Sequence, residues 1–126
     1  MYSIDGDMVT FTNGKHRQFG AQIAEVVDFE GTFVLRLAPD PFYNNENVYS
    51  FDYVGNLLWQ IPHRPQVQGQ CPYIGLCRKD FQFIEAFNWN GFAIVLHPRI
   101  GTIIQEGIHF NNVAPSRRTP PRRVWI

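Results

Sequence analysis

The sequence has few charged side chains and only two cysteines, and it contains no long apolar run. Charged residues make up 17% of the 126 positions, against about 25% in a typical soluble domain. No stretch approaches the roughly 20 apolar residues of a membrane-spanning helix. The first residues, MYSIDGDMVTF, carry acids where a signal peptide has its apolar core. These absences favour a cytoplasmic protein without a membrane anchor.

Motifs that point to a particular enzyme class are also missing. The sequence has no HExxH pair, no phosphate loop, no GxSxG elbow and no dinucleotide fingerprint. Its four histidines are scattered along the chain, at His16, His63, His97 and His109. The sequence therefore predicts no metal site and no cofactor, and it leans toward a protein that is not an enzyme.

The two cysteines, Cys71 and Cys77, leave three alternatives open. A reducing compartment favours two free thiols. A disulfide requires Pro72 and Gly75 to bend the segment, because the two Cα atoms must come within about 7 Å. A zinc site that also used His63 and His97 would lack the tight paired spacing that such sites usually show.

Aromatic and apolar residues are plentiful, and their spacing predicts an all-β domain. Aromatics reach 15% of the chain, with eleven phenylalanines, which is enough for a substantial core. Apolar residues alternate with a period of two, and Gly-containing turns interrupt them every eight to twelve residues or so. Asn13-Gly14 between two strand-like runs is a strong hairpin signal, and Glu30-Gly31 marks a second hairpin.

The pattern predicts an antiparallel meander of nine or ten short strands, folded as a sandwich or a barrel. The expected strands after the second hairpin are 48–52, 57–61, 73–78, 81–87, 92–97 and 102–106. Residues 1–110 are expected to form one domain with one core, and residues 111–126 an Arg/Pro-rich tail without periodicity.

Two phrases resemble a known repeat: NVYSFDYVGNLLWQI at 47–61 and FIEAFNWNGFAIVLHPRIGTII at 83–104. The first matches through Tyr49, Phe51, Asp52, Gly55, Leu58, Trp59 and Ile61. The second matches through Ala86, Trp89, Gly91, Pro98, Gly101 and Ile103. These residues resemble the quinoprotein-type (PQQ-like) β-propeller repeat, and the chain also looks like small uncharacterised bacterial single-domain proteins. The resemblance implies blade-like β-hairpins.

The same chain is too short for a closed propeller. A blade takes about 40–45 residues, and the smallest propellers have about four blades, whereas this chain has 126 residues. A quinone site uses residues from many blades, so the resemblance carries no cofactor residues to this sequence.

Two glutamates interrupt stripes of apolar residues. Glu25 shares its predicted strand face with Ile23, Val27 and Phe29. Glu85 likewise shares its predicted strand face with Phe81, Phe83 and Phe87. One interpretation makes them weak candidate catalytic acids, since paired carboxylates hydrolyse glycosides. The favoured interpretation is structural, with each acid at a strand end, facing water, or paired with an arginine such as Arg36 or Arg78.

The polar segment 62–72 and the residues near it are the main candidate binding site. Loops on a rigid β scaffold often carry binding, and exposed tyrosine and tryptophan are enriched in interfaces. A plain connection between sheets is the alternative. The candidates are His63, Arg64, Gln66, Gln68, Tyr73 and Trp89, with Tyr43 and Tyr53 as further exposed aromatics.

The C-terminal tail carries the second group of candidates. The last ten residues hold four of the eleven basic side chains and no acid, which leaves seven basic and eleven acidic side chains in residues 1–116. The four are Arg117, Arg118, Arg122 and Arg123, and Trp125 follows them. The tail is expected to dock on an acidic surface, on its own body or on a partner, or to remain an unstructured end.

The sequence favours a non-enzymatic binding or interaction protein, which acts on a protein partner or forms a homo-oligomer. One form of this function is a bacterial protein that inhibits another protein. The first alternative is a small-ligand or carbohydrate-processing enzyme that uses a buried glutamate. The second is a homo-oligomer or a nucleic-acid contact made through the tail. The acidic body makes nucleic-acid binding unlikely elsewhere, because phosphate neutralisation supplies most of that affinity.

Overall fold

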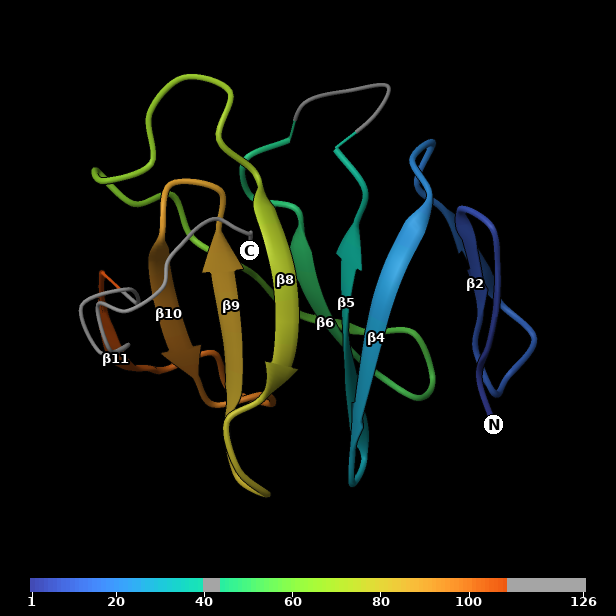
Figure 1. Cartoon of the computed structure of the whole chain (residues 1–126). Helices are drawn as coiled ribbons and strands as arrows, with labels where there is room; N and C mark the ends of the chain where they lie inside the picture. Colours follow the sequence, from blue (N-terminus) through green and yellow to red (C-terminus); the bar gives the residue numbers. More distant parts are fainter. Residues whose placement is uncertain (40–43, 109–126) are drawn as a thin grey trace.

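Every regular element in the computed structural model is a β-strand (Figure 1). The structure describes residues 1–39 and 44–108. Tyr43, the four tail arginines and Trp125 lie outside these residues. No helix in the described part of the chain is long and apolar enough to cross a membrane. The strands are β1 (Ser3–Asp5), β2 (Met8–Thr10), β3 (His16–Gln18), β4 (Ile23–Phe29), β5 (Thr32–Leu37), β6 (Val48–Asp52), β7 (Leu57–Gln60), β8 (Tyr73–Arg78), β9 (Ile84–Asn88), β10 (Phe92–Leu96) and β11 (Ile103–Ile108).

These strands form three antiparallel sheets, none of which closes into a barrel. The N-terminal sheet has the order β1-β2-β3, the central sheet β4-β5-β6-β7, and the C-terminal sheet β11-β10-β9-β8. The predicted all-β antiparallel meander is confirmed, and residues 1–39 and 44–108 contain eleven strands where nine or ten were expected. The strand that the sequence did not reveal is β1, which is only three residues long and therefore too short to show a period.

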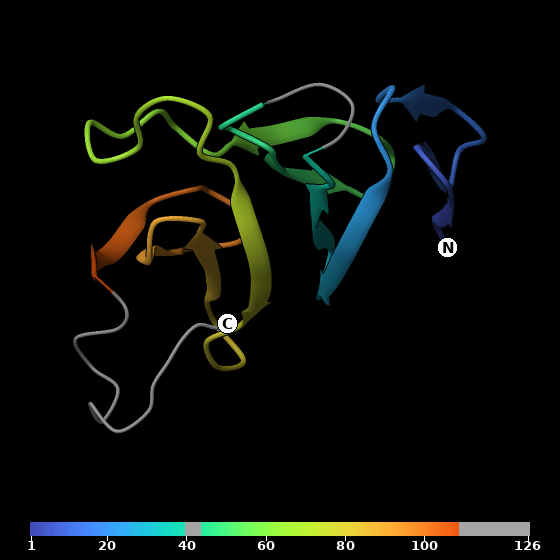
Figure 2. The same cartoon turned by 45° about the horizontal axis from the view of Figure 1, so that its top comes forward.

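The three sheets follow one another as layers, with the central sheet between the other two (Figure 2). One face of the central sheet packs on the N-terminal sheet through Phe33, Leu35 and Phe51, together with Val9 and Phe11. The other face packs on the C-terminal sheet, in a cluster that includes Val34, Val48, Ile61, Tyr73, Leu76, Ile84, Ile94 and Leu96. The described residues thus form two core clusters where the sequence led us to expect one. The first core cluster lies between the N-terminal and central sheets, and the second lies between the central and C-terminal sheets.

Alternation along the strands explains how one sheet serves both cores. In β5, Phe33, Leu35 and Leu37 point toward the N-terminal sheet, while Val34 points toward the C-terminal sheet. Phe92, Ile94 and Leu96 of β10 likewise share one face, in agreement with the period of two in the sequence.

The predicted face of β4 is wrong at its first residue. The pairing of β4 with β5 shifts between Ile23 and Glu25, and such a bulge moves the following side chains to the other face. Ile23 therefore packs with the N-terminal sheet, whereas Val27 and Phe29 pack with the C-terminal sheet.

The phrase at 47–61 forms the hairpin β6–β7, and its apolar residues divide between the two cores. Tyr49 and Phe51 pack toward the N-terminal sheet, and Trp59 and Ile61 pack toward the C-terminal sheet. The alternation along 57–61 predicts that Leu57 shares the buried face of Trp59 and Ile61. It is instead 46% exposed, because it lies at the turn end of an edge strand.

The turn of this hairpin is held by Asp52. Its Oδ1 accepts hydrogen bonds from the backbone amides of Val54 and Asn56, at 3.1 and 2.8 Å. Burial acts to raise the pKa of Asp52, but these bonds and one from the Asn56 side chain hold that pKa below its usual range. Gly55 has a positive φ of 98°, and a Cβ placed there would lie 2.8 Å from Cδ2 of Phe11 in the first core.

The predicted strand 81–87 begins later than expected, at Ile84. The Asp80 carboxylate accepts hydrogen bonds from the amides of Gln82 and Phe83. Lys79 N donates to Phe83 O at 2.9 Å, which closes the turn. Phe81 therefore sits at a turn tip and is 81% exposed, so its predicted place in an apolar stripe is wrong.

Two polar contacts tie the central sheet to the C-terminal sheet. Asn47 is fully buried, and its side chain bonds to Leu37 O, to Tyr73 O and to Tyr73 N at 2.8–2.9 Å. At the other end of the sheets, Pro98 O accepts bonds from Ser50 Oγ at 2.6 Å and from Trp59 Nε1 at 2.9 Å. Side chains therefore satisfy backbone groups of Leu37, Tyr73 and Pro98, near the ends of β5, β8 and β10.

We predict that Asn47→Ala lowers the free energy of unfolding by about 3 kcal/mol or more, because it leaves buried backbone groups without partners. The matched control is Asn13→Ala. Asn13 bonds to Val54 O at an exposed position, where water replaces the lost bond, so its cost should be about 1 kcal/mol or less. Urea denaturation of both variants measures the difference, and equal costs would contradict the prediction.

Gly55→Ala should destabilise the protein more than Gly14→Ala. Both glycines have a positive φ, but a Cβ at Gly14 meets nothing within 4 Å. Gly14→Ala should therefore cost only the backbone strain of about 1–2 kcal/mol. Gly55→Ala adds the clash with Phe11, for roughly 1–3 kcal/mol more. Thermal unfolding of the two variants compares them, and a smaller loss for Gly55→Ala would be evidence against this packing.

Stability should fall as the pH rises above about 10, because two tyrosines at the edge of the first core resist ionisation. Burial, followed by the hydrogen bond to Asp28, raises the pKa of both Tyr2 and Tyr53 above the ordinary value near 10. The unfolded chain then loses these protons first, so this stabilisation is complete below pH 10 and is lost above it. Urea denaturation from pH 7 to 11 should show a less steep loss for Tyr2→Phe than for the wild type.

Candidate functional site

Three connections meet at one end of the molecule, which is the upper end in Figure 1. They are residues 44–47 before β6, residues 62–72 between β7 and β8, and the turn 89–91 between β9 and β10. We call them together the loop end. Four predicted binding residues lie in the 62–72 connection, and a fifth, Trp89, lies in the turn.

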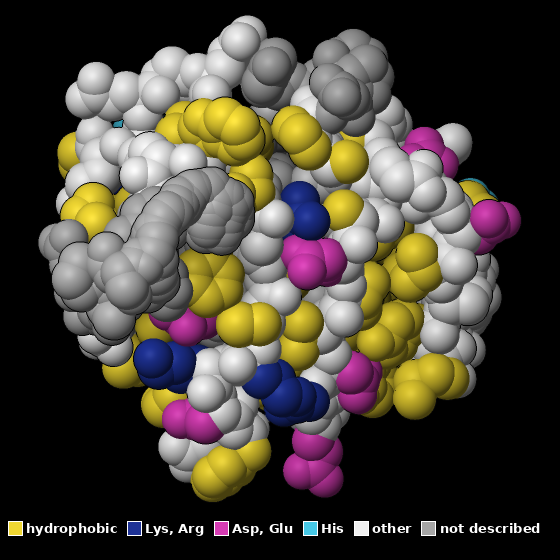
Figure 3. All heavy atoms as spheres, in the orientation of Figure 1, with side chains coloured by type: hydrophobic (Ala, Val, Ile, Leu, Met, Phe, Trp, Pro, Cys, Tyr) yellow, Lys and Arg dark blue, Asp and Glu magenta, His cyan; other side chains and the backbone are white. Residues whose placement is uncertain are grey.

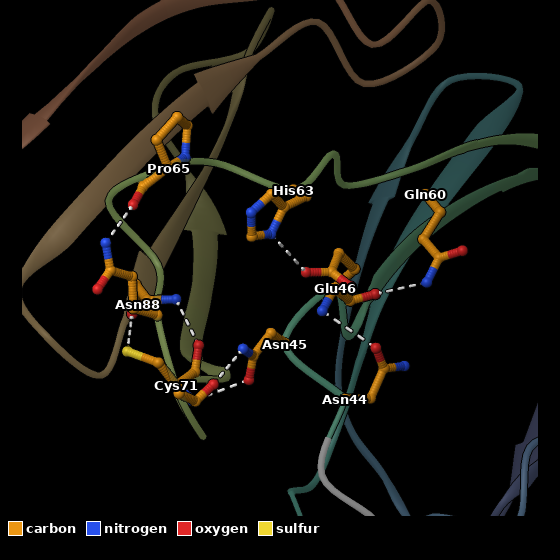
Figure 4. A network of polar contacts seen from close by, with 10 residues as sticks. Asn44, Asn45, Glu46, Gln60, His63, Pro65, Cys71 and Asn88 are labelled. Atoms are coloured by element: carbon orange, nitrogen blue, oxygen red, sulfur yellow. Dashed lines mark hydrogen bonds and ion pairs between the residues drawn. The ribbon is translucent and has the colours of Figure 1, made fainter.

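Asparagine side chains hold the 62–72 connection in place. Asn45 accepts a bond from Cys71 N at 2.8 Å and donates to Gly69 O at 2.5 Å. Asn88 donates to Cys71 O at 2.9 Å, and its Oδ1 accepts from the Cys71 thiol at 2.7 Å. Figure 4 shows how these side chains converge on Cys71 from both sheets. The connection is thus fixed from both sides near its end.

The middle of the connection is fixed as well. Asn90 donates to Gln66 O at 2.9 Å, which joins the turn of Trp89 to the loop. Val67 is buried in the second core cluster. These contacts give the loop end a defined shape before any partner is bound.

The charged side chains of the loop end are paired with one another. Arg64 makes a two-pronged contact with Glu106 of β11, at 2.9 Å from Nε and 2.5 Å from Nη2. His63 Nδ1 lies 3.5 Å from Glu46 Oε2, as Figure 4 shows. Arg64 is half-buried and His63 is exposed. A partner would therefore meet charge pairs rather than a patch of one sign.

Tyr73, also a predicted binding residue, has its side chain inside the protein. It is 1% exposed and belongs to the second core cluster. Burial raises the pKa of its hydroxyl. Among the described residues, this hydroxyl is the one buried side-chain oxygen or nitrogen without a hydrogen-bond partner. Tyr73 thus packs between the sheets, beneath the surface formed by the other candidates.

Trp89 has the opposite environment. Its side chain is 69% exposed, at the tip of the turn between β9 and β10. The turn itself is rigidly built, because Trp89 N donates to Pro72 O and Gly91 N to Asn88 O. Gln66 and Gln68 are exposed in the adjoining loop. Trp89 is therefore an exposed aromatic side chain on a fixed backbone.

The two glutamates lie away from the loop end, on the strands of the central and C-terminal sheets. Glu25 Oε1 accepts a bond from Arg36 Nε at 2.6 Å, so the predicted pairing with an arginine is confirmed for Glu25. Both glutamates lie close enough to Cys77 to raise the pKa of its thiol, in addition to the larger effect of burial. On the side of the molecule that Figure 3 shows, acidic and basic side chains are interspersed.

Both cysteines are free thiols, Cys71 buried and Cys77 exposed, as the favoured alternative predicted. Within residues 1–39 and 44–108, no group of three or more His, Cys, Asp or Glu side chains could hold a metal ion. Tyr53, expected as an exposed aromatic, is half-buried, and its hydroxyl donates to Asp28 and to Phe29 O.

Sequence reasoning missed the asparagines that build the loop end. The run at 44–47 contains three of them and the run at 88–90 contains two. Asparagine clusters usually mark turns, and here several of the side chains bond across the chain, between residues 17 to 26 positions apart. Only the approach of the sheets reveals these partners.

Comparison with known proteins leaves the function open. Neither the curated proteins nor the solved structures give a match. One family model, described as "Domain of unknown function (DUF7957)", matches residues 1–108. The match spans all three sheets and the loop end, and the chain belongs to this family.

Proposed function

We propose that this protein is a non-enzymatic module that binds another protein through the loop end. The observation that carries the proposal is Trp89, an exposed tryptophan on a turn that hydrogen bonds hold rigid. Tryptophan is among the residues that contribute most to protein interfaces. A fixed backbone lowers the entropy cost of binding, because little remains to be ordered.

The surroundings of Trp89 support a protein partner. Gln66 and Gln68 offer exposed amides in the adjoining loop, Arg64 is paired with Glu106, and His63 Nδ1 lies 3.5 Å from Glu46 Oε2. An apolar anchor within a polar rim is the usual composition of such interfaces. A cytoplasmic location and the inhibition of a bacterial protein are part of this proposal. The two free thiols are in keeping with a reducing compartment.

The carbohydrate-processing alternative has less support. Glu25 is engaged with Arg36, and catalysis by two carboxylates needs both acids to face a bound sugar. Glu25 and Glu85 share Cys77 as a neighbour, but they lie away from the loop end.

Trp89→Ala should abolish or greatly weaken capture of the partner by the immobilised protein from source lysate. With the partner purified, calorimetry should show a loss of about 2 kcal/mol, or roughly 30-fold in affinity. The matched control is Phe81→Ala, which removes an equally exposed aromatic side chain from the opposite end of the same sheet.

Equal effects of the two variants would contradict a recognition surface around Trp89. Retention of full affinity by Trp89→Ala would do the same. Far-UV circular dichroism of both variants confirms that the fold is intact, since both side chains lie outside the two core clusters.

A further inference from the structure

Strand β10 has an unusual composition for the sheet in which it lies. All five of its residues, Phe92–Leu96, are apolar. An antiparallel sheet with one face in water normally alternates apolar and polar residues. Phe92, Ile94 and Leu96 fill the second core cluster. Ala93 and Val95 point the other way, belong to neither cluster, and are still only 6% and 5% exposed.

The side chains around Ala93 and Val95 define the outer face of the C-terminal sheet. Phe87 lies opposite Ala93, and Glu85 lies opposite Val95. Cys77 is paired with Glu85 from the other side. Directly opposite residues of paired strands share a face. The outer face is thus apolar at Phe87, Ala93 and Val95, with Glu85 and Gln105 on either side of Val95.

Neither of the other two sheets covers this surface. The central sheet packs on the opposite face of the C-terminal sheet, and the N-terminal sheet lies beyond the central sheet. A strand that is apolar on both faces is typical of a sheet covered on both sides. The central sheet is covered in this way, and its strand β5 sends Phe33 and Leu35 to one core and Val34 to the other. The composition of β10 therefore indicates a cover.

We propose that residues 109–126 of the same chain dock on the outer face of the C-terminal sheet. This segment begins directly after Ile108, which is paired with Phe92, the first residue of β10. It has 18 residues, so it reaches up to about 60 Å when extended. Neighbouring strands are about 5 Å apart, so the segment is long enough to return across the whole sheet.

Charge and apolarity agree with this occupant. The segment carries Arg117, Arg118, Arg122 and Arg123 and no acid. Glu85 lies on the outer face beside Cys77, and Glu25 is also near enough to Cys77 to act on its thiol, so carboxylates lie where the arginines would dock. Val124, Trp125 and Ile126 end the segment and match the apolar side chains of Phe87, Ala93 and Val95.

The test uses the full chain with a nitroxide spin label on Cys77. This thiol is exposed, whereas Cys71 is buried, so labelling is selective. The readout is the indole N–H resonance of Trp125 in the isotope-labelled protein. Docking predicts that Trp125 loses most of its intensity relative to the same sample after chemical reduction of the label.

Charge variants identify what holds the segment. Replacing all four arginines with glutamate should restore the Trp125 signal, and replacing them with lysine should leave it broadened. A label at Gln105→Cys in a Cys77→Ser background reports from the same face, since Gln105 lies opposite Val95. This second label shows whether the label at Cys77 itself prevents the segment from docking. A label at His16→Cys, in the N-terminal sheet, should leave Trp125 sharp.

Two outcomes would overturn the proposal. A sharp Trp125 resonance with labels at both Cys77 and Gln105→Cys means that the segment does not dock there. Broadening that appears only when isotope-labelled chains are mixed with spin-labelled, unenriched chains means that the outer face binds a second copy instead. The result for Trp89→Ala binding is independent of both, because the loop end and the outer face share none of these residues.

Discussion

The fold depends on a central sheet that is apolar on both faces. Its strand β5 sends Phe33 and Leu35 to one side and Val34 to the other. Such a sheet is unstable in water unless a layer covers each face, because each exposed apolar face would forgo the free energy of its burial. The N-terminal and C-terminal sheets supply these layers. The sequence order of the sheets is therefore also their order in space.

Side-chain hydrogen bonds add to apolar packing in holding the sheets and their connections together. Where the central and C-terminal sheets approach each other, Asn47 at one end and Pro98 O at the other carry the polar contacts between them. At the loop end, the same strategy fixes a connection that has no regular structure of its own. Amide side chains can replace strand pairing because they offer a donor and an acceptor together. A rigid surface around Trp89 is the consequence.

The C-terminal sheet repeats the central sheet in one respect, since a strand within it is apolar on both faces. The repetition links the architecture to the two proposals. The loop end offers a surface whose shape is set within residues 1–108, the range of the family match. For the outer face we propose a further layer, supplied by the Arg-rich segment that follows β11 directly. The two proposals therefore assign recognition and covering of the sheet to separate surfaces.

The sequence by itself determined the all-β class, the hairpins at Asn13-Gly14 and Glu30-Gly31, and the alternation within most strands, because these depend on residues close together in the chain. Only the tertiary structure decided the rest. The bulge after Ile23 reversed a face, Asp80 shortened a strand, and Tyr73 went inside while Trp89 stayed outside. It also joined Asn45, Asn47 and Asn88 to residues up to 26 positions away. Sequence periodicity cannot show such partners, since they are set by how the sheets approach each other.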